Sequence, residues 1–389
     1  MSRFGSIFSQ LLQLFSRTEF QRAVRKTGAE RQAKGFSCWG QFVAMLFCQL
    51  GRAHSLREIC GGLASCEGKL THLGIRGAPR RSTLAYANEH RPWQLYELIF
   101  LELLERCRLQ ASGWKRKFRF KNKLMSLDST TIELCAKVFD WAKFRRAKGA
   151  VKLHLVLDHD GYPPGFAHIT EGEVSDVRVA QMLHFEPGTI VVDDRGYNDH
   201  GLWGKWCCDG VYFVTRMKAN TLYEVCEKRD CLPNSPVLAD EIIRLTGKGA
   251  EEKCPHYLTR VLWCDIEREE VFVFVTNHLK VSPFTVAAIY KERWQIEIFF
   301  KLIKQNLKIK TFVGTSANAL KIQIWTALIA MLILKYLQIK STFSWSISNL
   351  VALFRMNLFT YRDLWAWLNE PMGTPALGQI PEQLSLKWS

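Results

Sequence analysis

The sequence has no pair of cysteines in the Cys-x-x-Cys spacing, although it contains 12 cysteines among 389 residues. Zinc ribbons and thiol–disulfide oxidoreductases depend on that spacing, so its absence argues against both classes of protein. The nearest neighbours are the adjacent Cys207 and Cys208, followed by Cys226 and Cys231, which are five residues apart. Scattered cysteines on a long chain are typical of free thiols in a reducing compartment, and we therefore expect a cytoplasmic protein.

Long apolar segments are also scarce. The longest runs from Ile322 to Leu337, is interrupted by Gln323 and Lys335, and is shorter than the roughly 20 residues that span a bilayer. It predicts a buried core helix and not a membrane span. The segment Met1–Phe15 is short and amphipathic and lacks the cleavage pattern of a secretory signal. We expect neither export nor a membrane partner.

Acidic residues are few relative to basic ones. The chain has 37 Asp and Glu against 53 Lys and Arg, which gives a formal net charge of +16 and a pI of about 9.4. Such an excess indicates a polyanionic partner, either nucleic acid or an anionic membrane surface. Charge alone also fits a basic soluble protein, so the choice between these alternatives depends on the motifs.

Local patterns divide the chain, since it contains no internal repeat and no low-complexity linker. Apolar residues at helical spacing predict a helical N-terminal part and helices near the C-terminus, and between them strands and helices alternate. That alternation is typical of a mixed α/β sheet. We predict a helical segment at residues 1–112, an α/β segment at 113–219 and a β-rich segment at 220–280. Two helical segments follow, at 281–315 and 316–389.

Two aspartates lie where such a sheet carries its ligand site. Asp128 is in the first predicted strand of the sheet and Asp194 ends the fourth, while Glu297 is on a helix that we expect to pack on the sheet. Three acids without Cys or His favour a hard cation, Mg²⁺ or Mn²⁺, and two such ions assist phosphoryl transfer by activating the attacking oxygen and stabilising the leaving one. Taken singly, each aspartate is better explained by a cap or an Asx turn, so the prediction rests on the three together.

A second group of side chains follows helical spacing close to Glu297. Tyr290, Arg293, Glu297 and Lys304 are separated by three, four and seven residues, so one continuous helix would bring them onto one face. The carboxylate suits a divalent cation, and the hydroxyl and cationic groups suit phosphates. The alternative is an ordinary solvated helix face with ion pairs four residues apart.

Further contacts with DNA are expected around this helix. Arg216 and Lys218, at the end of the fifth predicted strand, are candidates for phosphate binding, as is Lys301; surface cations without a role are the alternative. Trp294 is suited to stack on an unpaired base and equally suited to fill the core. The helical N-terminal segment is separated from the sheet by a basic run, Lys115–Lys123, and we predict that it recognises specific DNA sequences.

These motifs resemble those of bacterial DDE transposases of insertion-sequence family four, whose signature is Tyr-x2-Arg-x3-Glu-x6-Lys. The signature positions are the four residues of the helical group. Leu127-Asp128-Ser129-Thr130 resembles the first catalytic aspartate motif. Asp194-Arg195-Gly196-Tyr197 resembles the second, which selects Asp194 over its neighbour Asp193. The similarity includes the N-terminal helices and the segment after the signature, so it covers nearly the whole chain.

The resemblance implies an RNase H-like mixed sheet with flanking helices, built from residues 113–219 and 281–315 and interrupted by the β-rich insertion 220–280. A helical N-terminal DNA-binding domain would precede this core and C-terminal helices would follow it. Asp128, Asp194 and Glu297 would be both the catalytic residues and the ligands of two Mg²⁺ ions, for which Mn²⁺ can substitute.

It also implies a reaction and its partners. In cut-and-paste transposition, water attacks a phosphodiester at the element end, and the freed 3′-OH cuts the opposite strand as a hairpin. A second hydrolysis and strand transfer follow. The partner would be double-stranded DNA, both the terminal inverted repeats and the target, held by a homodimer. The protein would be cytoplasmic in a bacterium and associated with the nucleoid when bound to DNA.

Two other functions fit part of the sequence. An RNase H-like nuclease that cuts without joining needs only the three acids, whereas the complete signature favours transposition. A non-catalytic DNA-binding regulator predicts that one acid is lost, and all three are present.

Overall fold

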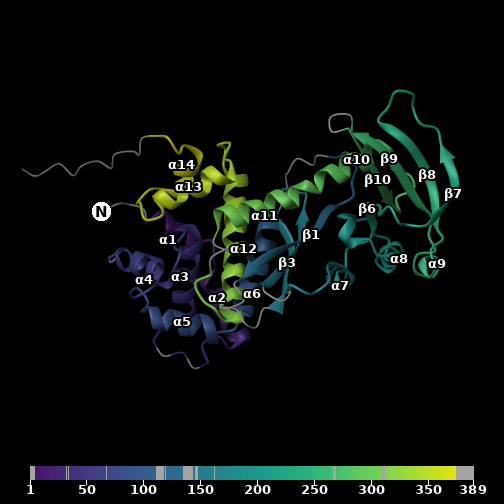
Figure 1. Cartoon of the computed structure of the whole chain (residues 1–389). Helices are drawn as coiled ribbons and strands as arrows, with labels where there is room; N and C mark the ends of the chain where they lie inside the picture. Colours follow the sequence, from purple (N-terminus) through teal and green to yellow (C-terminus); the bar gives the residue numbers. More distant parts are fainter. Residues whose placement is uncertain are drawn as a thin grey trace, which may run out of the picture. The chain divides into compact units, whose positions relative to one another are not determined.

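The computed structural model of the chain describes residues 5–31, 33, 35–66, 68–110, 118, 120–134, 143–144, 148–161, 163–265, 269–307 and 312–373. The chain forms two compact units, Met1–Cys107 with Leu302–Ser389, and Arg108–Lys301 (Figure 1). The first unit therefore combines two segments that are far apart in the sequence. The finer boundaries given by the sequence patterns stay a prediction. Residues 115–117 and 119 of the basic run Lys115–Lys123 lie outside the described residues.

The first unit is helical, as predicted. Its N-terminal helices are α1 (Ile7–Leu12), α2 (Arg17–Thr27), α3 (Cys38–Leu50), α4 (Leu56–Ala64), the short 3₁₀ helix η1 (Leu70–Leu73), α5 (Arg81–His90) and most of α6 (Gln94–Gln110). Its C-terminal helices are α12 (Ala317–Lys340), α13 (Ile347–Asn357) and α14 (Leu364–Asn369). The Ser55 hydroxyl accepts the Glu58 N–H at 3.2 Å and caps the start of α4.

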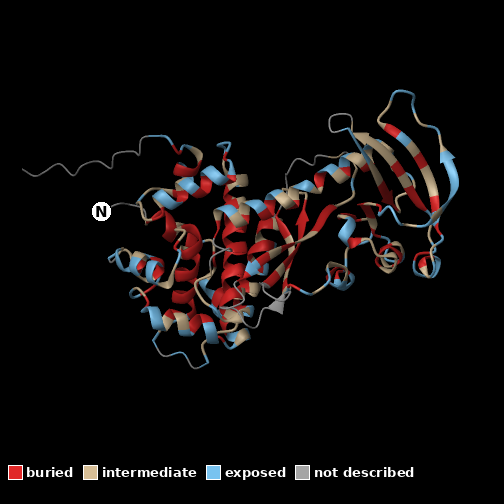
Figure 2. Cartoon of the chain, viewed as in Figure 1, coloured by how far each residue is buried: buried red, intermediate tan, exposed pale blue. Residues whose placement is uncertain are grey.

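The predicted core helix is confirmed at α12, which is longer than the segment recognised in the sequence. With 24 residues it is long and apolar enough to cross a membrane, so the expectation that it would be too short was wrong. However, 83% of its most apolar window is buried within the structure, and it packs on α3, α5 and α13 (Figure 2). The buried Thr326 hydroxyl of this helix donates to the Ile322 carbonyl at 2.7 Å.

The second unit is built on one mixed sheet with helices on its faces, which confirms the α/β class. Its ten strands are β1 (Leu124–Leu134), β2 (Lys143–Phe144), β3 (Lys148–Asp158), β4 (Pro164–Glu171), β5 (Ile190–Val192), β6 (Tyr212–Arg216), β7 (Tyr223–Arg229), β8 (Val237–Leu245), β9 (Leu258–Asp265) and β10 (Glu270–Thr276). The strand order is β2-β3-β1-β5-β6-β10-β9-β8-β7, with β4 paired to β3. The pairs β1–β5 and β5–β6 are parallel, and the others are antiparallel.

The β-rich segment continues this sheet. Because β10 pairs with β6, the strands from β7 to β10 extend the sheet that carries β1 and β5. Strand β8 was not predicted, since Asp240 and Glu241 interrupt its apolar pattern. In the structure Asp240 lies 3.7 Å from Arg229 of β7, and Glu241 lies 2.6 Å from Arg260 of β9. The neighbouring strands therefore supply the partners of both acids. Sequence alternation cannot show such cross-strand pairing.

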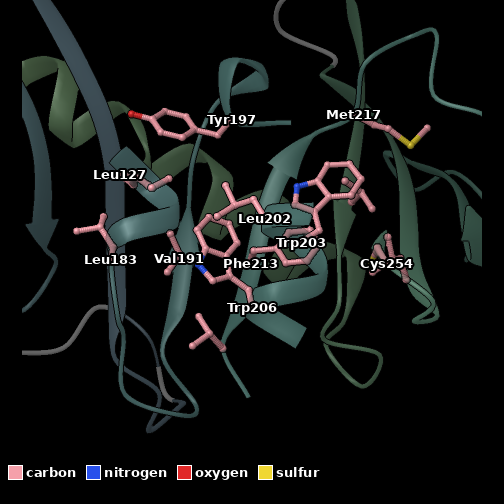
Figure 3. Packing of buried hydrophobic residues seen from close by; sticks show 14 of the residues in the cluster. Leu127, Leu183, Val191, Tyr197, Leu202, Trp203, Trp206, Phe213, Met217 and Cys254 are labelled. Carbon is pink, nitrogen blue, oxygen red and sulfur yellow. The ribbon is translucent and has the colours of Figure 1, made fainter. Parts of the chain in front are cut away.

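Helices cover both faces of the sheet around β1 and β5. The helices of this unit are α7 (Asp176–Met182), the 3₁₀ helix η2 (Arg195–Tyr197), α8 (His200–Cys208), α9 (Ala250–Lys253), α10 (Pro283–Glu292) and most of α11 (Trp294–Asn306). Leu127 and Val191 contribute to a cluster with Trp203 of α8 (Figure 3). Val192 and Ile289 belong to the cluster on the other face, against α10. Alternate residues of each strand therefore face α8 or α10.

Candidate active site

Asp128 and Asp194 lie at the same level of neighbouring parallel strands. The last paired residues of β1 and β5 are Ser126 and Val192, and each aspartate follows two residues later. The prediction that both acids lie at this edge of the sheet is therefore supported. One detail was wrong, because β5 ends at Val192 and Asp194 is the cap of η2 and not the last residue of the strand. Its carboxylate accepts the Gly196 N–H at 2.7 Å, which is the Asx turn considered as the alternative.

Strand alternation separates Asp194 from Asp193. Val192 faces α10, and Asp194, two residues later and still extended, is expected on the same side as Asp128. Asp193 is 0% exposed, and neither of its carboxylate oxygens has a hydrogen-bond partner in the described part of the chain. Burial raises the pKa of Asp193 well above its usual range, which favours the neutral form of this side chain. Its chemistry is that of a buried structural group.

The signature residues lie on two consecutive helices, α10 and α11, which meet at Arg293. At this point the Arg293 N–H donates to Tyr290 at 3.1 Å and the Ile296 N–H donates to Arg293 at 3.2 Å. These three-residue steps tighten the turn, so the prediction of one continuous helix was wrong. The backbone of Arg293 stays helical, with φ −50° and ψ −34°, and the direction of the chain is therefore retained. No proline or glycine marks this break in the sequence.

Arg293 lies between two of the acids. Its guanidinium is 2.6 Å from Glu297 Oε1 and 3.7 Å from Asp128 Oδ2. The contact with Asp128 is shielded from water, since 12% of the Arg293 side chain and 16% of the Asp128 side chain are exposed. The Glu297 side chain is 34% exposed. The guanidinium thereby brings together one acid from β1 and one from α11. The sequence predicted that these acids meet at a metal ion, and that part stays a prediction.

The carboxylates repel one another when ionised. Burial raises the pKa of Asp128 to about 7, and the charges of Asp194 and Glu297 act in the same direction. The Ser129 N–H and the Arg293 guanidinium oppose this rise by stabilising the charged form. A half-buried group of acids whose charges are incompletely balanced is a favourable environment for a divalent cation.

The donor set fits a hard cation. One oxygen of each carboxylate is fixed: Oδ1 of Asp128 by the Ser129 N–H, Oδ1 of Asp194 by a backbone N–H, and Oε1 of Glu297 by Arg293. The second oxygens accept no hydrogen bond from the residues that the structure describes. However, no three His, Cys, Asp or Glu in the described ranges are close enough together to hold an ion.

The other predicted contacts are distributed around these acids. The ring of Tyr290 packs against Phe274 at 4.8 Å, with the Arg293 guanidinium 5.5 Å from its centre. Trp294 is 56% exposed, which excludes the alternative of a core tryptophan. Lys301 and Lys218 are exposed, Arg216 lies over the ring of Phe272, and Lys304 is a half-buried residue of α11 beyond the boundary between the units.

A polar cluster on the other side of β1 was not predicted. Asp176, at the start of α7, accepts from the Ser129 hydroxyl at 2.7 Å and from Lys152 at 3.3 Å. His154 is fully buried, with Nδ1 3.5 Å from Asp176 and Nε2 2.9 Å from the Thr170 hydroxyl. His154 is thus a hydrogen-bonded core histidine. The cluster fixes the strand next to Asp128.

We expect His154 to make the protein sensitive to acid. Burial lowers its pKa from 6.5 to about 4, so between these values the unfolded chain takes up a proton that the folded protein does not. The free energy of unfolding should fall across this window by up to about 3 kcal/mol. Urea unfolding, measured between pH 7 and 4.5, gives the free energy of unfolding, and its loss on acidification should be smaller in His154→Gln than in the wild type. His168→Gln, on the paired strand, is the control and should retain it; equal loss in all three proteins would contradict the assignment.

Comparisons with known proteins identify the family of the chain. Residues 119–333 match the family described as transposase DDE domain, and residues 5–76 match a domain of unknown function, DUF4372. A protein of Sinorhizobium fredii named as a candidate transposase, y4zB, is 31% identical over 326 residues, which are 82% of this chain and 89% of that protein.

A transposase assigned to insertion sequence element IS5377 of Geobacillus stearothermophilus is 28% identical over 269 residues, which are 68% of this chain and 69% of that protein. Among solved structures, a piggyBac transposase synaptic complex with hairpin DNA aligns with 95% of this chain and 82% of that one, at 9% identity and a TM-score of 0.44. A similarity this low supports no argument about the fold.

Proposed function

Because this chain belongs to the transposase DDE domain family, we propose that it cuts DNA at the ends of its own insertion sequence and joins them to target DNA. The reaction would take place at Asp128, Asp194 and Glu297. The observation that supports this most directly is the grouping of a β1 acid and an α11 acid around one guanidinium, level with the acid that follows β5. Three carboxylates from an RNase H-like sheet and its flanking helix would then act together.

In this proposal the three carboxylates bind divalent cations, two Mg²⁺ ions, with Mn²⁺ able to replace them. Such ions, when bound, supply activation of the attacking oxygen and stabilisation of the leaving one. The protein's own residues orient the DNA. Arg293 would move from Glu297 to the scissile phosphate, and Tyr290 and Lys304 would hold phosphates beside it. The exposed indole of Trp294 is placed to stack on an unpaired base.

Cations outside the signature would hold the flanking duplex. Lys301 and Lys218 are exposed on the unit that carries the acids, and Arg216 is half-buried there. We propose that they contact the DNA backbone, and that two copies of the chain hold two element ends, with a hairpin intermediate in a cut-and-paste route. The family supports transposition; the hairpin and the dimer rest on the resemblance to insertion-sequence family four.

The products of one reaction test the proposal. The full-length protein is incubated with a short duplex that carries its own element end, a target duplex and Mg²⁺, and the products are separated on denaturing gels. Nicked, hairpin and joined DNA are expected in that order of appearance. Nicked DNA that is never joined would indicate a nuclease. No cleavage with Mg²⁺ or Mn²⁺ would reject the proposed active site.

Recognition of the element ends is expected to involve the exposed face of α5. Arg80 and Arg81, at its start, and Arg76, in the preceding loop, are all exposed. Replacing Arg80 and Arg81 together with Ala should lower the slope of log affinity against log salt by about two, because two phosphate contacts are lost. The slope is measured by fluorescence anisotropy with a duplex of the element end, titrated at several salt concentrations. Lys248→Ala with Lys253→Ala is a control with the same change in charge, and an unchanged slope in the arginine variant would move recognition elsewhere.

A further inference from the structure

A buried polar network connects the elements that carry the candidate acids. Ser126 Oγ is 2.6 Å from His159 Nε2, and His159 Nδ1 is 3.8 Å from Glu292 Oε2. Ser126 lies on β1 two residues before Asp128 and, by strand alternation, faces the same side. His159 follows the last residue of β3, and Glu292 is the last residue of α10, next to Arg293. The network thus joins two strands to the point where α10 gives way to α11.

The network is protected from solvent. Ser126 is 0% and Glu292 3% exposed, and 7% of the His159 side chain is exposed. When the Ser126 hydroxyl donates to Nε2, a neutral imidazole carries its proton on Nδ1, on the side of the Glu292 carboxylate. One imidazole therefore serves a strand hydroxyl and a helix carboxylate together. A buried carboxylate without such a partner would destabilise the folded state.

We propose that Ser126, His159 and Glu292 are positioning residues that set the distance between Asp128 on β1 and Glu297 on α11. This inference rests on the proposed function, because it concerns the geometry of the proposed cation site. They would act through the backbone of β1, which carries Asp128, and through the α10–α11 junction. Ligand groups bind a cation well only when their supports hold them in place. Loosening the junction lets Glu297 drift from Asp128 and weakens binding.

The affinity for Mn²⁺ alone tests this inference without DNA or turnover. Free Mn²⁺ is measured by electron paramagnetic resonance in titrations of the full-length protein. We expect the dissociation constant to rise about tenfold in Ser126→Ala, His159→Leu and Glu292→Leu. Glu292→Gln keeps an acceptor for the imidazole N–H and should remain within about twofold of the wild type.

A matched control separates positioning from loss of stability. Val286 is a fully buried residue of α10, and Val286→Ala removes packing from the same helix without touching the network. It should lower the melting temperature and leave Mn²⁺ affinity unchanged. If Ser126→Ala and His159→Leu bind Mn²⁺ like the wild type, or no worse than Val286→Ala at an equal loss of melting temperature, the positioning role is overturned.

The proposed function has its own readout in the same titration. Asp128→Asn should lose the Mn²⁺ site. If Asp128→Asn binds Mn²⁺ like the wild type, the cation site itself is rejected, whatever the network variants do. If Asp128→Asn loses binding while the network variants keep it, only the positioning inference fails. Should His159→Leu not fold, the smaller change Ser126→Ala decides alone: weaker binding supports the inference, and wild-type binding overturns it.

Discussion

We expect strand cleavage to be abolished, with rates reduced about a thousandfold or more, in each of the variants Asp128→Asn, Asp194→Asn and Glu297→Gln. When residues act as one catalytic unit, the loss of any one of them removes most of the activity of the unit. Each change keeps the shape of the side chain and removes one negative charge. DNA affinity should stay within about twofold of the wild type or rise slightly, since affinity comes from cations that bind phosphates. Denaturing gels measure cleavage, and fluorescence anisotropy measures binding to the same duplex.

Asp193→Asn is the matched control for this series. Asp193 is adjacent to Asp194, but strand alternation places it on the opposite side from Asp128. Burial raises the pKa of its carboxyl and so favours the neutral form, and an amide of the same shape should therefore be tolerated. We expect cleavage within a few-fold of the wild type. The reverse pattern, with Asp193→Asn inactive and Asp194→Asn active, would show that the second acid is misassigned. Full activity in all three acid variants would reject the site.

The sequence predicts single elements of this site well, because their signals are local. The apolar run before Asp128 predicts a strand, and Ser55 with Glu58 predicts the start of α4; both are present. Asp128 and Asp194 lie at the same height in the sheet because of the register between β1 and β5. That register pairs residues more than 60 positions apart in the sequence. Local patterns carry no information about that register.

The contacts of Arg293 show a second limit. Helical spacing predicts its pairing with Glu297, which is observed at 2.6 Å. Its approach to Asp128, and the network of Ser126, His159 and Glu292, come from packing between elements distant in the sequence. Glu292 was one of the unassigned positions within the signature, and a carboxylate at the end of a helix is ordinarily solvated. In the structure Glu292 is buried, and its contact with His159 becomes visible only there.

Arg293→Ala should change metal binding and catalysis in opposite directions. The guanidinium neutralises Asp128 and Glu297 before a cation arrives, and it competes with that cation for the same oxygens. Without it, the dissociation constant for Mn²⁺ should fall about tenfold, because a positive charge next to the site is removed. Cleavage should slow about a hundredfold, because a cationic donor beside the scissile phosphate is lost. Arg293→Lys keeps the charge without the planar fork and should also be slow.

Arg216→Ala is the control for this opposition, since it removes one arginine from the same unit. Arg216 lies over the ring of Phe272, and no ion pair joins it to a carboxylate in the described part of the chain. Both alanine variants should lower the salt slope of DNA binding by about one. Only Arg293→Ala should tighten Mn²⁺ binding. If Mn²⁺ binding weakens in Arg293→Ala, the guanidinium supports the carboxylates and does not compete with the cation, and its movement to the phosphate would be rejected even if cleavage is slow.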